Sequence, residues 1–167
     1  ELIINVLKTI LRRFSKTKER DVFLFSLLGY DTTNKNYKTA FIHKSFNQKN
    51  HNERLEFLGD AVLSTIIAEF LFLEYQNQQE GFLSQKRAII VGRRHLNLIG
   101  EKIIPKEQIK SNFITPPSSV FGNTLEAIIG AIYLDKGIKQ ASIFVRKHIY
   151  KSDFINDLED IDFKSKL

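Results

Sequence analysis

Two polar side chains interrupt an otherwise apolar stretch near the end of the chain, VFGNTLEAIIGAIYLD at positions 120–135. Asn123 and Glu126 are three residues apart, so on an α-helix they share one face, about 60° from each other. Gly130 falls between them one turn further along, and Ala127 borders the same face. Because small residues allow another helix to approach closely, this face is expected to meet a second helix. An amide oxygen and a carboxylate are ligands that hard divalent cations accept.

A second acidic group lies in the segment from Glu53 to about Tyr75, which predicts a long helix that is apolar over most of its circumference. On that helix Glu53, Glu56 and Asp60 share an arc of about 60°. A solvated acidic face is the simpler interpretation. On a largely apolar helix, however, the acids are expected to be partly shielded from water, and shielded carboxylates need a cation partner.

If the two helices cross at these faces, their side chains form an oxygen-only cluster. Such a cluster suits Mg²⁺, with Mn²⁺ as a substitute, and water would complete the coordination. The four histidines show no zinc spacing and are interpreted as structural or surface groups: His43, His51, His95 and His148. The predicted metal-binding residues are Glu56, Asp60, Asn123 and Glu126.

Apolar spacing is helical almost everywhere, and no alternating strand pattern persists, so the predicted fold class is all-α. Residues 105–119 are expected to form a loop or short turns before Ser118 and Ser119 start the helix that carries Asn123. Gly92 is a candidate break in the fifth helix. The expected helices cover residues 2–14, 20–30 (ending near Gly29), 37–46, 53–75, 80–103, 120–135 and 138–154.

The amino-acid composition excludes several classes of function but does not identify one. The 167 residues carry a formal net charge of +6, which favours a polyanionic partner such as nucleic acid. The absence of cysteine excludes disulfides, thiolate metal sites and cysteine nucleophiles, and it favours an intracellular protein. No apolar run approaches the roughly 18 residues needed to span a bilayer, so no membrane association is expected. No motif for a small organic cofactor is present.

Four segments together resemble the bacterial ribonuclease III family. NERLEFLGDAVL is similar to the family's signature, and NTLEAIIGAIYLDKG is similar to its second acidic motif. AFIHKSF and EGFLSQKRAIIVGRRHL extend the resemblance, which covers residues 37–137.

The resemblance implies a helical endonuclease domain that acts as a cytoplasmic homodimer on double-stranded RNA. A Mg²⁺-dependent (or Mn²⁺-dependent) hydrolysis would leave 5′-phosphate and 3′-hydroxyl products, with ribosomal and messenger RNA processing as the expected role. By matching positions, Asp60 and Glu126 would be catalytic, and Glu53 would lie beside the site, where it would either contact the RNA or order the cleft. Phe57 would insert into the partner subunit, whereas ordinary core packing is the alternative for this residue. Basic residues along the RNA-binding surface are candidates for phosphate contacts, although a solvated surface charge is the simpler interpretation of any one of them: Lys44, Lys86, Arg87, Arg93 and Arg94.

Two features depart from the family pattern. Asn123 stands where the family usually has aspartate, which removes one negative charge and predicts weaker metal binding. The family usually continues into a double-stranded RNA-binding domain, so we expect the endonuclease domain at residues 1–160 and the start of a linker at 161–167. The alternatives are a catalytically weakened member that acts as a dimeric RNA-binding scaffold and an unrelated helical adaptor with a solvated acidic face.

Overall fold

The computed structural model describes residues 21–150, which divide after Thr33 into two compact units. The described part of the first unit contains α2, Val22–Leu28. Its first turn is capped by the Asp21 carboxylate, which accepts a hydrogen bond from the Leu24 amide at 2.9 Å. It ends at Gly29, whose φ of 83° favours glycine. The helix end predicted near Gly29 is therefore confirmed.

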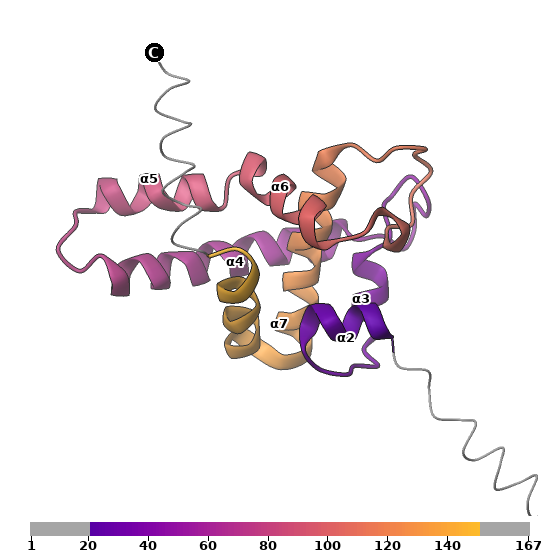
Figure 1. Ribbon diagram of the computed structural model, residues 1–167, viewed down its shortest axis with the longest axis horizontal. Coiled ribbons are helices and arrows are strands. Elements are labelled where there is room, and N and C mark those ends of the chain that lie inside the picture. Colours follow the sequence, from indigo (N-terminus) through magenta and orange to yellow (C-terminus); the bar gives the residue numbers. More distant parts are fainter. Residues whose placement is uncertain (1–20, 151–167) are drawn as a thin grey trace, which may run out of the picture. The chain divides into compact units, whose positions relative to one another are not determined.

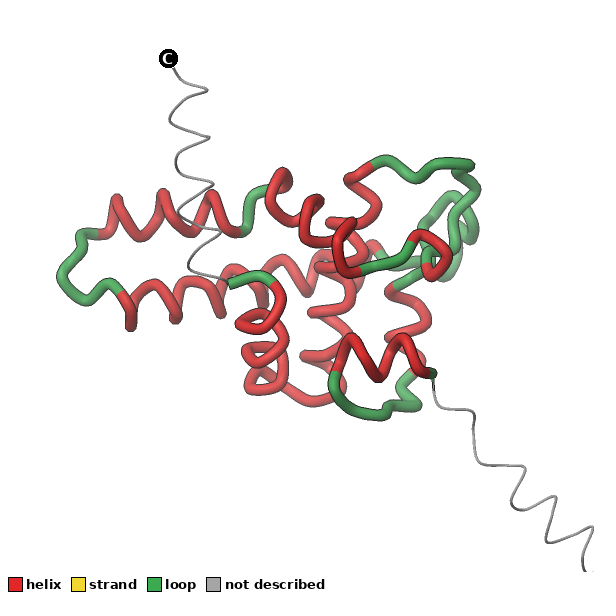
Figure 2. The backbone as a smooth tube through the Cα atoms, viewed as in Figure 1, coloured by secondary structure: helices red, strands yellow, loops and turns green. Residues whose placement is uncertain are grey.

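The described part of the second unit is helical and has no strand, so the all-α prediction is confirmed (Figures 1 and 2). Helix α4 runs beside α5, and α7 packs against α3, α4 and α6. The helices are α3 (Lys35–Ala40), α4 (Glu53–Glu74), α5 (Glu80–Ile90), α6 (Arg93–Ile103), a 3-10 turn η1 (Lys106–Gln108) and α7 (Ser118–His148).

The core of this unit is formed chiefly by α4 and α7. Leu63, Ile66 and Ile67 of α4 are fully buried, as are Leu125 and its apolar neighbours on α7. These residues belong to the two segments that contain the acidic side chains. The burial that holds the helices together therefore also fixes the position of those side chains.

Two glycines allow α4 and α7 to cross with their backbones in contact. A Cβ atom at Gly59 would lie 3.0 Å from the backbone nitrogen of Gly130 and closer still to the carbonyl oxygen of Glu126. A Cβ atom at Gly130 would in turn meet the carbonyl oxygen of Leu55. The close approach expected at Gly130 is confirmed, and Gly59 is its counterpart on the other helix.

Glycine also marks two changes of direction. Gly92 separates α5 from α6, so the break considered there is real; a side chain at Gly92 would crowd the carbonyl oxygen of Ala88 at 2.8 Å. In α7 the backbone leaves helical geometry at Gly137, where φ is 78°. That kink separates the segments expected as two helices, 120–135 and 138–154.

The helix expected at residues 37–46 is wrong in position. Helix α3 begins earlier, because the Asn34 side chain accepts a hydrogen bond from the Asn36 amide at 3.0 Å, and it ends at Ala40. The chain then pairs with the loop before α7 through an isolated bridge between Ile42 and Lys110. A long-range pairing thus replaces the local helical hydrogen bonds.

The last helix was expected to reach residue 154, but it ends at His148, and residues 149 and 150 are not helical. Two expectations fall outside the described residues: the helix at 2–14 and the domain boundary at 160. None of the helices between residues 21 and 150 is both long enough and apolar enough to cross a membrane.

The crossing generates a stability prediction. Gly59→Ala should lower the free energy of unfolding by about 2 kcal/mol or more, because the new methyl group meets rigid backbone rather than a mobile side chain. Gly81→Ala is the matched control, since a Cβ atom at Gly81 in α5 meets nothing within 4 Å. That change should leave stability unchanged or raise it by up to about 1 kcal/mol. Urea unfolding measures both; equal effects would show that the crossing is not tight.

Candidate active site

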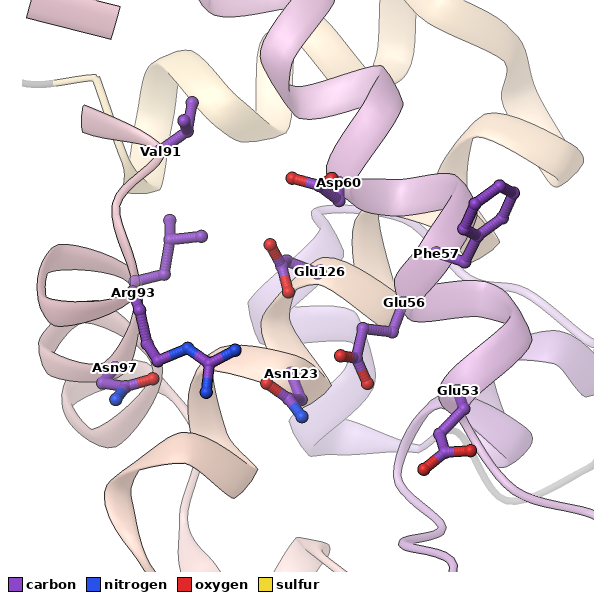
Figure 3. Close-up of a pocket in the computed structure, with 11 residues that line it drawn as sticks. Glu53, Glu56, Phe57, Asp60, Val91, Arg93, Asn97, Asn123 and Glu126 are labelled. Carbon is purple, nitrogen blue, oxygen red and sulfur yellow. The ribbon is translucent and has the colours of Figure 1, made fainter. Parts of the chain in front are cut away.

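The acidic side chains line one open cavity of about 430 Å³ in the second unit (Figure 3). Three parts of the chain form its walls: the first turns of α4, the second and third turns of α7, and the segment from Val91 to Asn97 that includes the start of α6. Figure 3 shows the α4 and α7 side chains facing the α6 side chains across this space. The prediction that Glu56, Asp60, Asn123 and Glu126 come together is supported by this shared cavity.

Helix α4 places its three acids at different depths. Glu56 is partly buried, whereas Asp60 and Glu53 are exposed. Glu53 lies at the rim, where its carboxylate pairs with the Lys44 ammonium at 2.7 Å. The hydrogen bond from Lys44 lowers the pKa of Glu53. Glu53 is thus engaged with the loop before α4, which fits a role in ordering the rim.

The start of α4 is held by a buried asparagine rather than by a helix cap. Asn52 is almost fully buried, and its side chain donates to the carbonyl oxygen of Ala40 at 3.3 Å. Its backbone amide donates to the carbonyl oxygen of Ile42 at 2.9 Å. These bonds fix the first turn of α4, and with it Glu53 and Glu56, to the end of α3.

Helix α7 places Asn123 and Glu126 at the base of the cavity, both partly buried. Gly122 precedes them, and a Cβ atom there would strike the Asn97 side chain of α6. One face of α7 therefore touches α4 through Gly130, and the adjacent part touches α6 through Gly122. The polar pair lies between these two contacts.

Burial and crowding of like charge raise carboxyl pKa values in the cavity. Burial, followed by the nearby charges of Asp60 and Glu56, raises the pKa of Glu126 to about 7. Burial, followed by Glu53, also raises the pKa of Glu56, while Arg93 lowers it. Carboxyl groups held in this way are favoured sites for a cation, because a cation offsets both effects.

The carboxylate and amide oxygens of the cavity are of the kind that a hard divalent ion binds. Their present positions, however, do not form a coordination sphere. No three His, Asp or Glu side chains in residues 21–150 already form a metal-binding group. Mutual repulsion keeps carboxylates apart when no cation lies between them, and rotation about their side-chain bonds can bring them together. Glu56, Asp60 and Glu126 would supply carboxylate oxygens and Asn123 an amide oxygen.

Phe57 is not a core residue. It is 80% exposed, and its ring is directed away from the carboxylates (Figure 3). The alternative of ordinary core packing is therefore wrong. An exposed phenylalanine next to the acidic face is available for contact with another chain.

The basic residues considered for phosphate contacts have different surroundings. Lys86 is buried beside the rings of Tyr75 and Phe82, at 5.2 and 5.3 Å, so its proposed contact with RNA is wrong. Lys44 pairs with Glu53 as described above. Arg93 lines the cavity, a placement that sequence spacing alone did not distinguish from that of its neighbours.

Two of the histidines have structural partners. His95 is buried and its Nδ1 lies 2.7 Å from the carbonyl oxygen of Ile90. His43 Nδ1 lies 2.9 Å from the Ser45 hydroxyl. Their interpretation as structural or surface groups is supported, because neither lines the acidic cavity.

The second unit is thus a helical domain in which two crossing helices present carboxylate and amide oxygens to one open, acidic cavity. The family model described as ribonuclease-III-like matches residues 34–153. The match begins where the second compact unit begins and includes every residue that lines the cavity. The chain belongs to the ribonuclease-III-like family.

Named relatives and solved structures support the same family membership. The chain is 40% identical to ribonuclease 3 of Azobacteroides pseudotrichonymphae over 98% of its own length and 67% of the relative's. It is 34% identical to ribonuclease 3 of Phocaeicola vulgatus over 98% of its length and 57% of the relative's. The chain thus spans between about half and two thirds of the length of such relatives.

The second comparison is with the nuclease domain of ribonuclease III from Campylobacter jejuni. One structure of that domain superposes with a TM-score of 0.72 at 34% identity, covering 77% of this chain and 94% of the other. That structure concerns flexibility in a region involved in dimer formation. A second structure, at 2.2 Å resolution, gives a TM-score of 0.71 and covers 80% of this chain. The resemblance read from the two acidic motifs is confirmed.

The raised pKa of Glu126 predicts a pH dependence of stability without divalent ions. In the unfolded chain this carboxyl loses its proton near pH 4.5, whereas the folded protein keeps it until about pH 7. The contribution of this carboxyl group to the free energy of unfolding is therefore fully present below pH 4.5. It is lost as the pH rises from there through 7, where the folded protein also gives up the proton.

Glu126→Gln should remove this loss. In EDTA, its free energy of unfolding should exceed that of wild type by on the order of 1 kcal/mol at pH 7.5 and by little at pH 4.5, since partial exposure weakens the effect. Glu69→Gln, an exposed change on α4 outside the cavity, is the control. If the difference in free energy of unfolding between Glu126→Gln and wild type did not grow with pH, the cavity would not disfavour the ionised form of Glu126.

Proposed function

We propose that this chain is the catalytic domain of a metal-dependent endoribonuclease that cuts double-stranded RNA and leaves 5′-phosphate and 3′-hydroxyl ends. The observation that carries the proposal is the shared cavity of Glu56, Asp60, Asn123 and Glu126 in a member of the ribonuclease-III-like family. The expected setting is cytoplasmic processing of ribosomal and messenger RNA.

The reaction is the hydrolysis of a phosphodiester. Water attacks phosphorus in line, the bond from phosphorus to the 3′ oxygen breaks, and the departing oxygen takes up a proton. A divalent ion at this site would supply an activated water and offset charge on the phosphate oxygens. Mg²⁺, with Mn²⁺ as a substitute, fits the oxygen donors.

In this reaction the residues of the cavity and of its rim would have different roles. Glu56, Asp60 and Glu126 would hold the cation. Without a cation the pKa of Glu126 is raised to about 7, so a cation that binds at neutral pH would displace a proton from this carboxyl group. Glu53 and Lys44 order the rim over which an RNA strand would pass.

Compared with an aspartate at this position, Asn123 reduces the negative charge of the site by one but still offers an oxygen atom to a metal ion. A neutral amide oxygen can ligate a divalent ion or accept a hydrogen bond from one of its waters. We therefore expect activity with a higher requirement for metal. Asn123→Asp should lower the metal concentration for half-maximal cleavage by about tenfold, because ligand charge tunes affinity.

Cleavage of a long RNA duplex at low salt in Mg²⁺ or Mn²⁺ tests the function. Wild type should give short duplex products, Glu126→Ala should give none above background, and Asn123→Asp should cut at lower metal concentration. If wild type and Asn123→Asp showed the same metal dependence, Asn123 would not be part of the metal site.

A second function has one observation in its favour, the amide at position 123. In that case the chain is a catalytically weakened, dimeric RNA-binding scaffold. Duplex binding without any metal-dependent cutting by wild type would support it, and restored cutting in Asn123→Asp would identify the lost carboxylate as the cause.

The proposed active form is a homodimer, for which the exposure of Phe57 is the support in this chain. Phe57→Ala should shift the protein toward monomer in sedimentation velocity. Ile114→Ala is the control, because Ile114 is a fully exposed apolar residue that does not line the acidic cavity. A dimer unaffected by Phe57→Ala would contradict this contact.

A further inference from the structure

Arg93 is the only basic residue among those that line the acidic cavity of the described chain. Figure 3 shows its side chain extending from the start of α6 toward Asn123 and Glu126, across the space from Glu56. No ion pair joins Arg93 to a carboxylate in residues 21–150, although Lys44 at the rim does form one. The guanidinium thus faces the acids with the cavity between them.

The position of Arg93 is unfavourable for the helix that carries it. Arg93 is the first residue of α6, and the first turn of this helix contains no acid. The helix dipole disfavours a cation at a helix N-terminus by a few tenths of a kcal/mol up to about 1 kcal/mol. Arg93 thus does not stabilise its own helix and forms no ion pair within residues 21–150, but its charge lowers the pKa of Glu56 and Glu126 across the cavity. The electrostatic partners of Arg93 therefore lie in the cavity.

A guanidinium is well suited to a phosphate group. Its planar fork presents several N–H donors to two oxygens at once, and it keeps its charge at all relevant pH values. The carboxylates on α4 and α7 attract a cation, whereas Arg93 on the opposite wall attracts an anion. A phosphate between them would meet positive charge on both sides.

We propose, building on the function proposed above, that Arg93 binds a non-bridging oxygen of the RNA phosphate that is cut. It thereby supplies positive charge where negative charge grows as the bond to the 3′ oxygen breaks. Arg93 and Asn123 then act in the same electrostatic direction: the amide removes a negative charge from the cavity and the guanidinium adds a positive one. The site gives up affinity for the cation and gains affinity for the phosphate.

Arg93→Gln separates these two effects, since it keeps polarity and approximate length but removes the charge. Without RNA, the variant should bind Mn²⁺ about threefold to tenfold more tightly than wild type, because a cation has left the cavity. At saturating Mg²⁺, its kcat on a duplex should fall about 10-fold to 100-fold, with a smaller change in KM. Arg93→Lys should recover part of kcat, because it restores charge without the fork.

The controls use the same helix and the same assay. Lys102→Gln removes an exposed positive charge from the last turn of α6, outside the cavity, and should leave kcat and Mn²⁺ affinity unchanged. The melting temperature of Arg93→Gln should stay close to that of wild type, because relief of the unfavourable helix-dipole interaction and loss of the attraction between Arg93 and the acids Glu56 and Glu126 act in opposite directions. A loss of kcat in a stable protein is then a loss of function rather than of fold.

Each outcome decides between the two proposals. If wild type cuts, Glu126→Ala does not, and Arg93→Gln cuts at the wild-type rate, Arg93 is only a counter-ion of the acids and the inference is overturned. If Arg93→Gln loses kcat while binding Mn²⁺ more tightly, the phosphate role is supported. If wild type itself fails to cut under all metal conditions, the proposed function falls, and the role of Arg93 in it falls too.

Discussion

The backbone contact between α4 and α7 at Gly59 and Gly130 is the constraint on which the rest of the structure depends. Without a side chain at either glycine, the two helices meet closely enough for the Glu126 carbonyl oxygen to occupy the place of a Gly59 Cβ atom. This crossing brings the first turns of α4 next to the middle of α7. The same burial of aliphatic side chains that stabilises the unit therefore assembles the cavity.

The crossing has an electrostatic cost, which gives the cavity its chemical character. Carboxyl groups are held near one another and partly away from water, so the pKa of Glu126 rises to about 7 and that of Glu56 also rises. Asn123 in place of a further acid and Arg93 on the facing wall both reduce this accumulation of negative charge. If the proposed function holds, the balance between these residues would set how strongly the site attracts a cation and how strongly it attracts a phosphate.

Local spacing was sufficient to predict much of this arrangement. Helical periodicity placed Glu56 and Asp60 on one face and Asn123 and Glu126 on another, and the small residue Gly130 correctly indicated a close helix contact. Features set by long-range packing were not predictable in this way. The pairing of Ile42 with Lys110 overrode a helical pattern, Lys86 is buried beside two aromatic rings, and Arg93 lines the cavity whereas its neighbour Arg94 does not.

The proposed function requires the two crossing helices to form one cation site. Crystals of the wild-type protein grown with Mn²⁺, measured at the manganese absorption edge, would locate bound manganese. We expect an anomalous peak in the cavity, bonded to carboxylate oxygens of Glu56, Asp60 and Glu126 at about 2.0–2.3 Å, with Asn123 beside it. A peak elsewhere, or none at a Mn²⁺ concentration that supports cleavage, would show that the crossing helices do not form this site.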